Sequence, residues 1–286
     1  MRLGVHVRIA AGLSKAIAVA ERLGCETIQL FASNPNAWRE SVVDQRTASD
    51  FRQGVSRVSI YPVILHTAYL LNLASADELI YSRSSKALAL ALPRADLLGA
   101  QHVVTHIGSH GGTGYAQGIR RINEAVRRAL DASPGDHMVL LEGGAGAGNT
   151  IGSQFDEMAE LLDGFGDYSE RVGIALDTAH LWAAGYDLSN EDAVDRTLAE
   201  FDRTVGLSRL RLLHCNDTKM ALGSHRDRHW HIGEGNIGIA GFRAIVNHES
   251  LRDVPGILET PMDEPGLDER NLSLLKSLRE PPGPEE

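Results

Sequence analysis

Eight short apolar runs recur along this chain at intervals of roughly 25 to 45 residues, and segments with helical periodicity separate most of them. The runs are 3–7, 27–32, 62–67, 102–108, 138–144, 172–180, 210–217 and 255–261. Helices are expected over 10–24, 82–99, 114–133, 155–165, 190–206, 240–249 and 268–279, with Pro93 kinking or dividing the second of them. Strands that are apolar throughout and alternate with helices are typical of a parallel sheet covered by helices.

Eight strand–helix units in 286 residues predict an α/β fold, a closed (β/α)8 TIM barrel. We expect one catalytic domain over residues 1–280 and a Pro- and Glu-rich tail, 281–286, that frays. The alternative is an open doubly wound sheet, which usually has a Gly-rich nucleotide-binding turn after its first strand. Here the first strand leads into HVRIAAG instead.

From the third run onward, the apolar runs end on residues that can bind a metal ion. These residues are His66, His106, Glu142, Asp177 followed by His180, His214 and Glu259. A polar side chain at the end of a buried strand costs desolvation free energy unless something compensates it. Asp227 and His229, two residues apart, would point to one side of an extended segment. Nine imidazole and carboxylate ligands exceed the needs of one catalytic zinc, so the sequence predicts two or three divalent ions at the carboxyl ends of the strands.

Other features of the sequence are less specific. GGAGAG (143–148) looks like a phosphate-cradling loop, but it lacks the Gly-Lys-Ser/Thr ending of a P-loop and is more simply a flexible loop after the fifth strand. Cys25 and Cys215 give no disulfide framework and no Cys-based zinc motif. The histidines at 102, 137 and 248 are expected on helices or surface loops.

Composition and the N-terminus limit the partners and the location. A net charge of −10 argues at first against a polyanionic partner, and 5% aromatic residues argue against a stacking surface for single-stranded nucleic acid. MRLGVHVRIAAG lacks the basic start and apolar core of a secretion signal, and no run is long enough to span a bilayer. We therefore expect no membrane association and a cytoplasmic location.

Seven segments together resemble the signature segments of the endonuclease IV family, the zinc-dependent apurinic/apyrimidinic (AP) endonucleases of base-excision repair. They are HTAYLLNLA (66–74), HIGSH (106–110), LEGGAGAGNTIG (141–152), DTAHLWAAGYDL (177–188), LHCNDTK (213–219), DRHWHIGEGNIG (227–238) and ILETP (257–261). The resemblance runs from GVHV at 4–7 to the eighth strand and implies the xylose-isomerase-like TIM barrel. All nine ligand positions carry the residue types that the family uses.

The resemblance implies a cluster of three Zn²⁺ ions, with Mn²⁺ as the alternative at one site. The nine positions divide into a first site of His66 and His106, a second of Asp177, His214 and Glu259, with Glu142 bridging these two, and a third of His180, Asp227 and His229. Glu142 is also implied as the catalytic residue. A metal-activated hydroxide would hydrolyse the phosphodiester 5′ to an abasic site in double-stranded DNA, leaving a 3′-hydroxyl and a 5′-deoxyribose phosphate. Cleaning of blocked 3′ ends and a monomeric state are implied as well.

The three ions would reverse the net charge of the ligand cluster at the carboxyl ends of the strands. Their six positive charges exceed the four negative charges of the carboxylates by two if every histidine is neutral. Phosphate contacts are then expected from the basic residues in or near the strand-to-helix loops, which are Arg8, Arg39, Lys219, Arg226 and Arg228.

Family members bend DNA and rotate the abasic nucleotide out of the duplex. The matching loop is NPNAW (34–38), and Tyr69 and Leu70 follow on the next loop. This chain has Asn36 where the family often carries an arginine, and Gly143-Gly144 where Asn-Thr is common. We expect Asn36, Tyr69, Leu70 and Arg228 to contact DNA.

Two other functions stay open at this point. A sugar isomerase or epimerase would share the barrel but need only one or two ions, so the third-site pair Asp227 and His229 distinguishes it. A non-catalytic DNA-binding or metal-storage protein would not require ligands gathered at the catalytic face.

Overall fold

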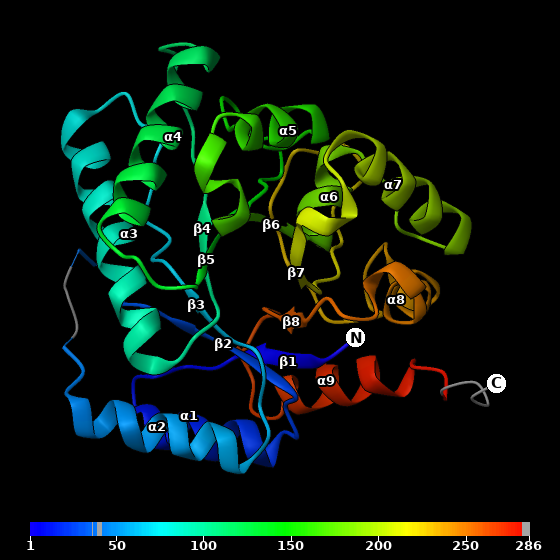
Figure 1. Cartoon of the computed structure of the whole chain (residues 1–286). Coiled ribbons are helices and arrows are strands. Elements are labelled where there is room, and N and C mark those ends of the chain that lie inside the picture. The colour runs from blue at the N-terminus through cyan, green and yellow to red at the C-terminus, as the bar shows by residue number, and fades with distance from the viewer. Residues whose placement is uncertain (36, 39–41, 282–286) are drawn as a thin grey trace.

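In the computed structural model of the chain, the eight apolar runs form strands that pair in sequence order and close into a parallel barrel (Figure 1). The structure describes residues 1–35, 37, 38 and 42–281. The strands are β1 (Leu3–His6), β2 (Thr27–Phe31), β3 (Val63–His66), β4 (His102–His106), β5 (Met138–Glu142), β6 (Val172–Asp177), β7 (Leu210–His214) and β8 (Gly256–Leu258). Because β8 pairs with β1, the predicted closed barrel is confirmed and the open sheet is excluded.

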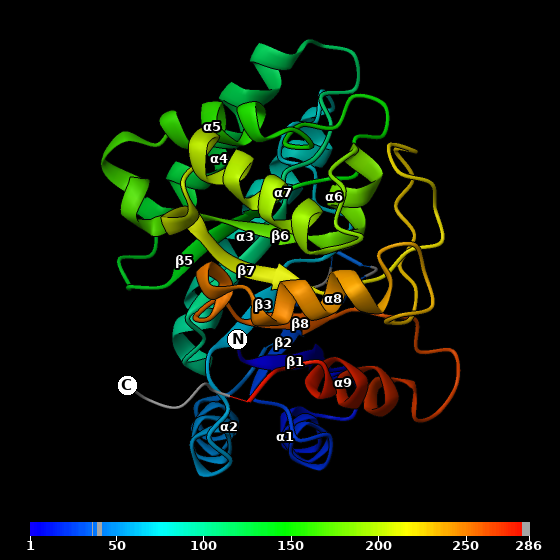
Figure 2. The same cartoon turned by 90° about the vertical axis from the view of Figure 1, so that its right-hand side faces the viewer.

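Helices surround the barrel, and α1 and α2 lie side by side along one flank (Figures 1 and 2). They are α1 (Leu13–Arg22), α2 (Gln45–Arg57), α3 (Glu78–Leu98), α4 (Tyr115–Asp131), α5 (Phe155–Asp163), α6 (Thr178–Ala184), α7 (Glu191–Thr204), α8 (Gly238–Asn247) and α9 (Leu267–Ser277), with short 3-10 helices at Gly166–Arg171, Leu207–Arg209 and Glu249–Leu251. No helix of the described residues has the length and apolarity to cross a bilayer. The tail expected at 281–286 lies outside the described residues except for Pro281.

The third helix shows how packing overrides a local signal. It begins at Asp77, whose carboxylate accepts hydrogen bonds from the backbone N–H groups of the first turn, and it ends at Gly99 in the left-handed conformation. Pro93 lies inside it, so of the two predicted effects of this proline, division of the helix was wrong, and a kink stays a prediction. Leu88 and Leu92 before the proline and Leu98 after it are buried, and this continuous apolar contact holds the helix together across the proline.

Two histidines lie where the sequence did not place them. His102 is the first residue of β4, and His137 is a buried residue directly before β5, so the prediction of helices or surface loops was wrong for both. They lie at the amino ends of their strands, the opposite end of the barrel from the candidate ligands. Burial, helped by Arg211, lowers the pKa of His102 to about 4. His248 does lie in the turn between α8 and the following 3-10 helix.

Candidate metal centre

The pleat of the strands explains why six of the candidate ligands meet. Inside the barrel one apolar layer is formed by Ile64, Val104, Leu140, Ala175, Leu212 and Ile257. Two positions later on each chain segment comes a candidate ligand, in the same order His66, His106, Glu142, Asp177, His214 and Glu259. Side chains alternate along a strand, so each ligand points inward, one layer nearer to the carboxyl end of the barrel.

Within the described residues, three groups of side chains could each hold a metal ion. The first group comprises His66, His106 and Glu142. His66 Nε2 lies 3.0 Å from Glu142 Oε2, and His106 Nδ1 lies 3.5 Å from the same oxygen. His66 and Glu142 are buried, while His106 is partly open to the mouth of the barrel.

The second group adds Asp177, His214 and Glu259 to the other side of Glu142. His214 Nδ1 lies 3.0 Å from Glu142 Oε1, 3.4 Å from Glu259 Oε2 and 3.9 Å from Asp177 Oδ2. Glu142 therefore turns one oxygen to the first group and the other to the second. A carboxylate in this position can bridge two ions.

The third group comprises Asp177, His180 and His229 at the edge of the barrel. We add Asp227, from a loop, because its two oxygens face both imidazoles. His180 stands in the first turn of α6, and Asp227 and His229 lie between β7 and α8. His180 Nε2 lies 3.3 Å from Asp227 Oδ2, and His229 Nε2 lies 3.4 Å from Asp227 Oδ1. Asp177 Oδ2 is 3.5 Å from His229 Nε2, so two carboxylates flank the pair of imidazoles.

Asp177 serves α6 and the cluster at the same time. As the N-cap residue of α6, its Oδ1 accepts hydrogen bonds from the backbone N–H groups of Ala179 and His180. The capping contact fixes the carboxylate and leaves Oδ2 turned toward the cluster. The spacing Asp-Thr-Ala-His thus places a carboxylate and an imidazole on one helix start.

The distances between the donor atoms of the third group match those between ligands of one zinc ion. Two ligands of a tetrahedral zinc with bonds of about 2.0–2.1 Å lie about 3.3–3.4 Å apart. The separations within the third group, 3.3 and 3.4 Å, match that edge length. Moreover, Nε2 of His180 and Nε2 of His229 are buried and face Asp227, but these contacts do not have hydrogen-bond geometry, and neither atom has another hydrogen-bond partner among the described residues. Such atoms are costly unless a ligand completes them.

Hydrogen bonds on the far side of three imidazoles set the tautomer that metal binding needs. In the neutral form of each ring, Nδ1–H donates to a backbone carbonyl, which puts the lone pair on Nε2, where a metal ion can bind. The pairs are His66 to Thr67 at 2.6 Å, His180 to Gly143 at 2.8 Å and His229 to Glu259 at 3.1 Å. Gly143 thus supports His180 through its backbone carbonyl. A Cβ atom at this position would lie 2.7 Å from the carbonyl oxygen of Gly152.

Charges inside the centre keep its carboxylates ionised. Burial alone would raise the pKa of Glu142, but His106 and His214 outweigh it and hold that pKa well below the ordinary value. Burial is likewise outweighed at Asp227, where His180 lowers the pKa to about 2. Burial would lower the pKa of His214, but Glu259 and Glu142 raise it to about 9. The metal-free centre therefore attracts cations, and bound ions would replace protons.

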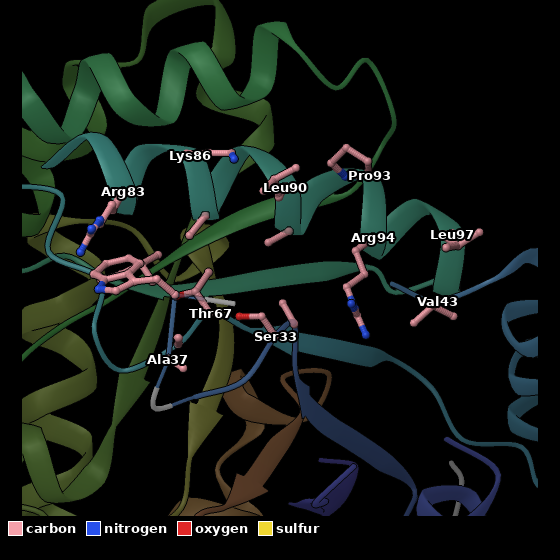
Figure 3. A pocket seen from close by; sticks show the side chains of 16 residues that line it. Ser33, Ala37, Val43, Thr67, Arg83, Lys86, Leu90, Pro93, Arg94 and Leu97 are labelled. Atoms are coloured by element: carbon pink, nitrogen blue, oxygen red, sulfur yellow. The ribbon is translucent and has the colours of Figure 1, made fainter. Parts of the chain in front are cut away.

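A cavity of about 620 Å³ lies between α3 and the segments that follow β2 and β3 (Figure 3). Arg83, Lys86 and Leu90 of α3 line one side, and Thr67, from the loop after β3, lies across from them. None of the nine candidate ligands lines this cavity.

Comparison with known proteins gives the family. A model of the xylose isomerase-like TIM barrel family matches residues 17–279. A probable endonuclease 4 of Methanoculleus marisnigri is 45% identical, with 96% of this chain and 98% of the relative covered. One from Halothermothrix orenii is 41% identical, covering 98% and 99%. The chain belongs to the endonuclease IV family.

Solved structures agree with this assignment. The crystal structure of endonuclease IV from Thermus thermophilus superposes with a TM-score of 0.86 at 34% identity, covering 97% of this chain and 98% of that one. A D-psicose 3-epimerase superposes with a TM-score of 0.66 at 16% identity, covering 96% and 90%. At that identity the epimerase shares the fold alone.

The side chains expected to contact DNA, where the structure describes them, are exposed on loops of this endonuclease IV barrel. Tyr69 and Leu70 are exposed on the loop after β3. The centroid of the Tyr69 ring lies 5.0 Å from the ring centroid of Phe31 and 6.2 Å from that of His106. The basic side chains Arg8, Lys219, Arg226 and Arg228 are exposed. Asn36 and Arg39 lie outside the described residues, so their predicted contacts stay predictions.

Sequence reasoning missed Asp217, a fully buried carboxylate that organises the loop carrying part of the third group. It accepts hydrogen bonds from the backbone N–H groups of Thr218, Gly233, Gly235, Ile237 and Gly238, at 2.8 to 3.2 Å. Its backbone also pairs with Trp230, the neighbour of His229. The signal was available, since LHCND continues polar beyond the ligand His214 and GEGNIG offers closely spaced N–H groups.

Asp217→Asn is expected to lower the free energy of unfolding of the metal-free protein by about 2–4 kcal/mol. The amide nitrogen would replace one acceptor oxygen and leave buried N–H groups of the 233–238 loop unsatisfied. Urea unfolding in a chelator measures the change. Glu234→Gln is the matched control, because Glu234 is exposed on the same loop and pairs with Arg270 at the surface. Equal stability of Asp217→Asn and the wild type would contradict the role of Asp217.

Proposed function

We propose that the protein is an AP endonuclease that hydrolyses the phosphodiester 5′ to an abasic site in double-stranded DNA, leaving a 3′-hydroxyl and a 5′-deoxyribose phosphate. The nine residues of the three groups would hold three divalent ions, Zn²⁺, with Mn²⁺ as the alternative at one site. The same centre would remove blocking groups from 3′ ends. We place the enzyme in the cytoplasm as a monomer.

The third group of ligands is the observation that carries this proposal. The ligands on the strands alone suit any barrel enzyme that uses one or two ions, including a sugar epimerase. His180, Asp227 and His229 add a further site outside the strand pattern, and its two buried Nε2 atoms lack hydrogen-bond partners among the described residues. A third ion adjoining the second is what phosphodiester hydrolysis at this centre would use.

Bound divalent ions would lower the pKa of a coordinated water, neutralise the phosphate and stabilise the leaving 3′-oxygen. The protein's own task is to fix the ligands at constant separation. Asn216 contributes by donating to Asp177 Oδ2 at 2.6 Å and accepting from the backbone N–H of Glu259 at 2.8 Å. The ligands of β6 and of the segment after β8 are thereby tied together.

The rim residues would hold the substrate. Tyr69 and Leu70 are exposed apolar surface beside the first group, suited to the gap that a missing base leaves in the stack. Arg228 is exposed one residue from Asp227, and the Lys219 ammonium lies 3.6 Å above the Trp230 ring. Both would contact phosphates that flank the abasic site.

A duplex with one abasic site tests the proposed function directly. With the damaged strand labelled at its 5′ end, we expect one cut on the 5′ side of the abasic residue and a product that a DNA polymerase can extend. The same duplex with an intact base should stay uncut. A cut on the 3′ side would contradict the proposal, as would epimerisation of a ketohexose without incision of DNA.

A further inference from the structure

Some polar side chains inside the barrel are not among the nine candidate ligands, and two of them contact Glu259 of the second group. They are His6 on β1 and Gln29 on β2, which are register partners on adjacent strands. Gln29 is fully buried. A buried amide is costly unless its oxygen and nitrogen both find partners.

Gln29 connects two residues of the second group. One end of its amide, Oε1, lies 2.9 Å from His214 Nε2, and the other end, Nε2, lies 2.6 Å from Glu259 Oε1. The carboxylate determines which end is which, because only an NH₂ group can face a carboxylate oxygen at that distance. Gln29 Oε1 therefore accepts a hydrogen bond from His214 Nε2–H.

This contact selects the form of His214 that can bind a metal. With its proton on Nε2, a neutral imidazole has its lone pair on Nδ1. Nδ1 is the atom that faces Glu142 Oε1 at 3.0 Å and Glu259 Oε2 at 3.4 Å. A reversed amide at Gln29 would demand the proton on Nδ1 and remove this ligand.

The same amide also gives the two carboxylate oxygens of Glu259 different roles. Oε1 receives the hydrogen bond from Gln29, and His6 Nδ1 lies 2.9 Å from it. Oε2 faces His214 Nδ1 instead. One oxygen of Glu259 is thus occupied by hydrogen bonds, and the other is left for an ion.

We propose that Gln29 is a positioning residue of the second metal site. It holds His214 in the tautomer that binds through Nδ1 and leaves Glu259 Oε2 as the binding oxygen. This inference rests on the proposed function, since it requires that the second group holds an ion. A purely structural amide would affect the stability of the metal-free protein and not the affinity for one ion, so the two roles can be separated.

Gln29→Leu tests the role, with Thr27→Val as the matched control. Leucine keeps the volume of the side chain but makes no hydrogen bond. Thr27 is buried on the same face of β2 and donates to the carbonyl of Pro62, away from the centre. Titration of the zinc-loaded proteins with a chromophoric chelator should show one ion bound about 10- to 100-fold more weakly in Gln29→Leu. The other ions, and all ions of Thr27→Val, should keep the wild-type affinity.

A second measurement can be decided on the wild type alone. In the zinc-loaded wild type with ¹⁵N-labelled histidine, His214 should carry its proton on Nε2, and the signal should shift in Gln29→Leu. Wild-type zinc affinity in Gln29→Leu, or a proton on Nδ1 of wild-type His214, would overturn the inference. If Gln29→Leu does not fold, Gln29→Met takes its place and the wild-type spectrum still decides. A wild type that binds no divalent ion would instead refute the proposed function.

Discussion

Glu142→Gln is expected to leave the barrel folded and to lower incision at abasic sites by roughly 10³-fold. Glu142 turns Oε2 to His66 and His106 and Oε1 to His214, so it is the one side chain shared by the first and second groups. Glutamine has nearly the same shape, but its NH₂ group offers no lone pair and the negative charge between the two groups is lost. A loss of roughly 10³-fold corresponds to about 4 kcal/mol of transition-state stabilisation.

Single-turnover incision of a duplex with one abasic site measures this loss. Elemental analysis of the same preparation should show that the first and second sites hold their ions less tightly. Glu160→Gln is the control for a lost carboxylate charge, since Glu160 is exposed on α5 and accepts a hydrogen bond from the hydroxyl of Tyr115, away from the centre. If Glu142→Gln incised DNA at the wild-type rate, Glu142 would not be a ligand of the metal centre.

Asp227→Asn is expected to release one ion of three and to lower incision by roughly 10²-fold. Each oxygen of Asp227 faces a different imidazole of the third group, and asparagine would keep only one oxygen and no charge. The cost in folding should be small, because the Asp227 side chain is 56% exposed. The ions of the first and second groups should stay bound.

Arg228→Gln provides the comparison for Asp227→Asn on the same loop. It should retain all ions and weaken DNA binding, with the dependence of log K on log salt reduced by about 1. Metal analysis and binding titrations at several salt concentrations separate the two variants. If Asp227→Asn retained its full complement of ions and its incision rate, the third site would not exist as described.

The fold followed from the sequence because its signals are local and repeated. Each strand lies within one of the eight mostly apolar runs, and seven of the helices begin and end within a few residues of their expected bounds. Two helices were missed for local reasons. Asp177 starts α6 in the middle of an apolar run, and the mostly polar α2 shows only Ala48, Phe51 and Val55 toward the core.

The site could be predicted from the sequence where its ligands lie on strands, because side chains two residues apart on a strand face the same side. His66, Glu142 and His214 each follow an inward apolar residue by two positions, so their convergence could be inferred from the pleat. Asp227 and His229 lie in a loop, and only their spacing and the family resemblance suggested them. Gln29 gave no signal in the sequence, because its importance comes from a hydrogen bond to a residue far away in the sequence. The polar continuation at Asp217 was visible, but its partners in the 233–238 loop were not.

The number of divalent ions in the purified wild type tests the central claim most directly. Protein prepared without chelator and freed of loosely bound metal should contain three ions per chain by elemental analysis, with zinc predominating. Three ions would support a centre made of all three groups. One ion, or two that persist unchanged in Asp227→Asn, would contradict it.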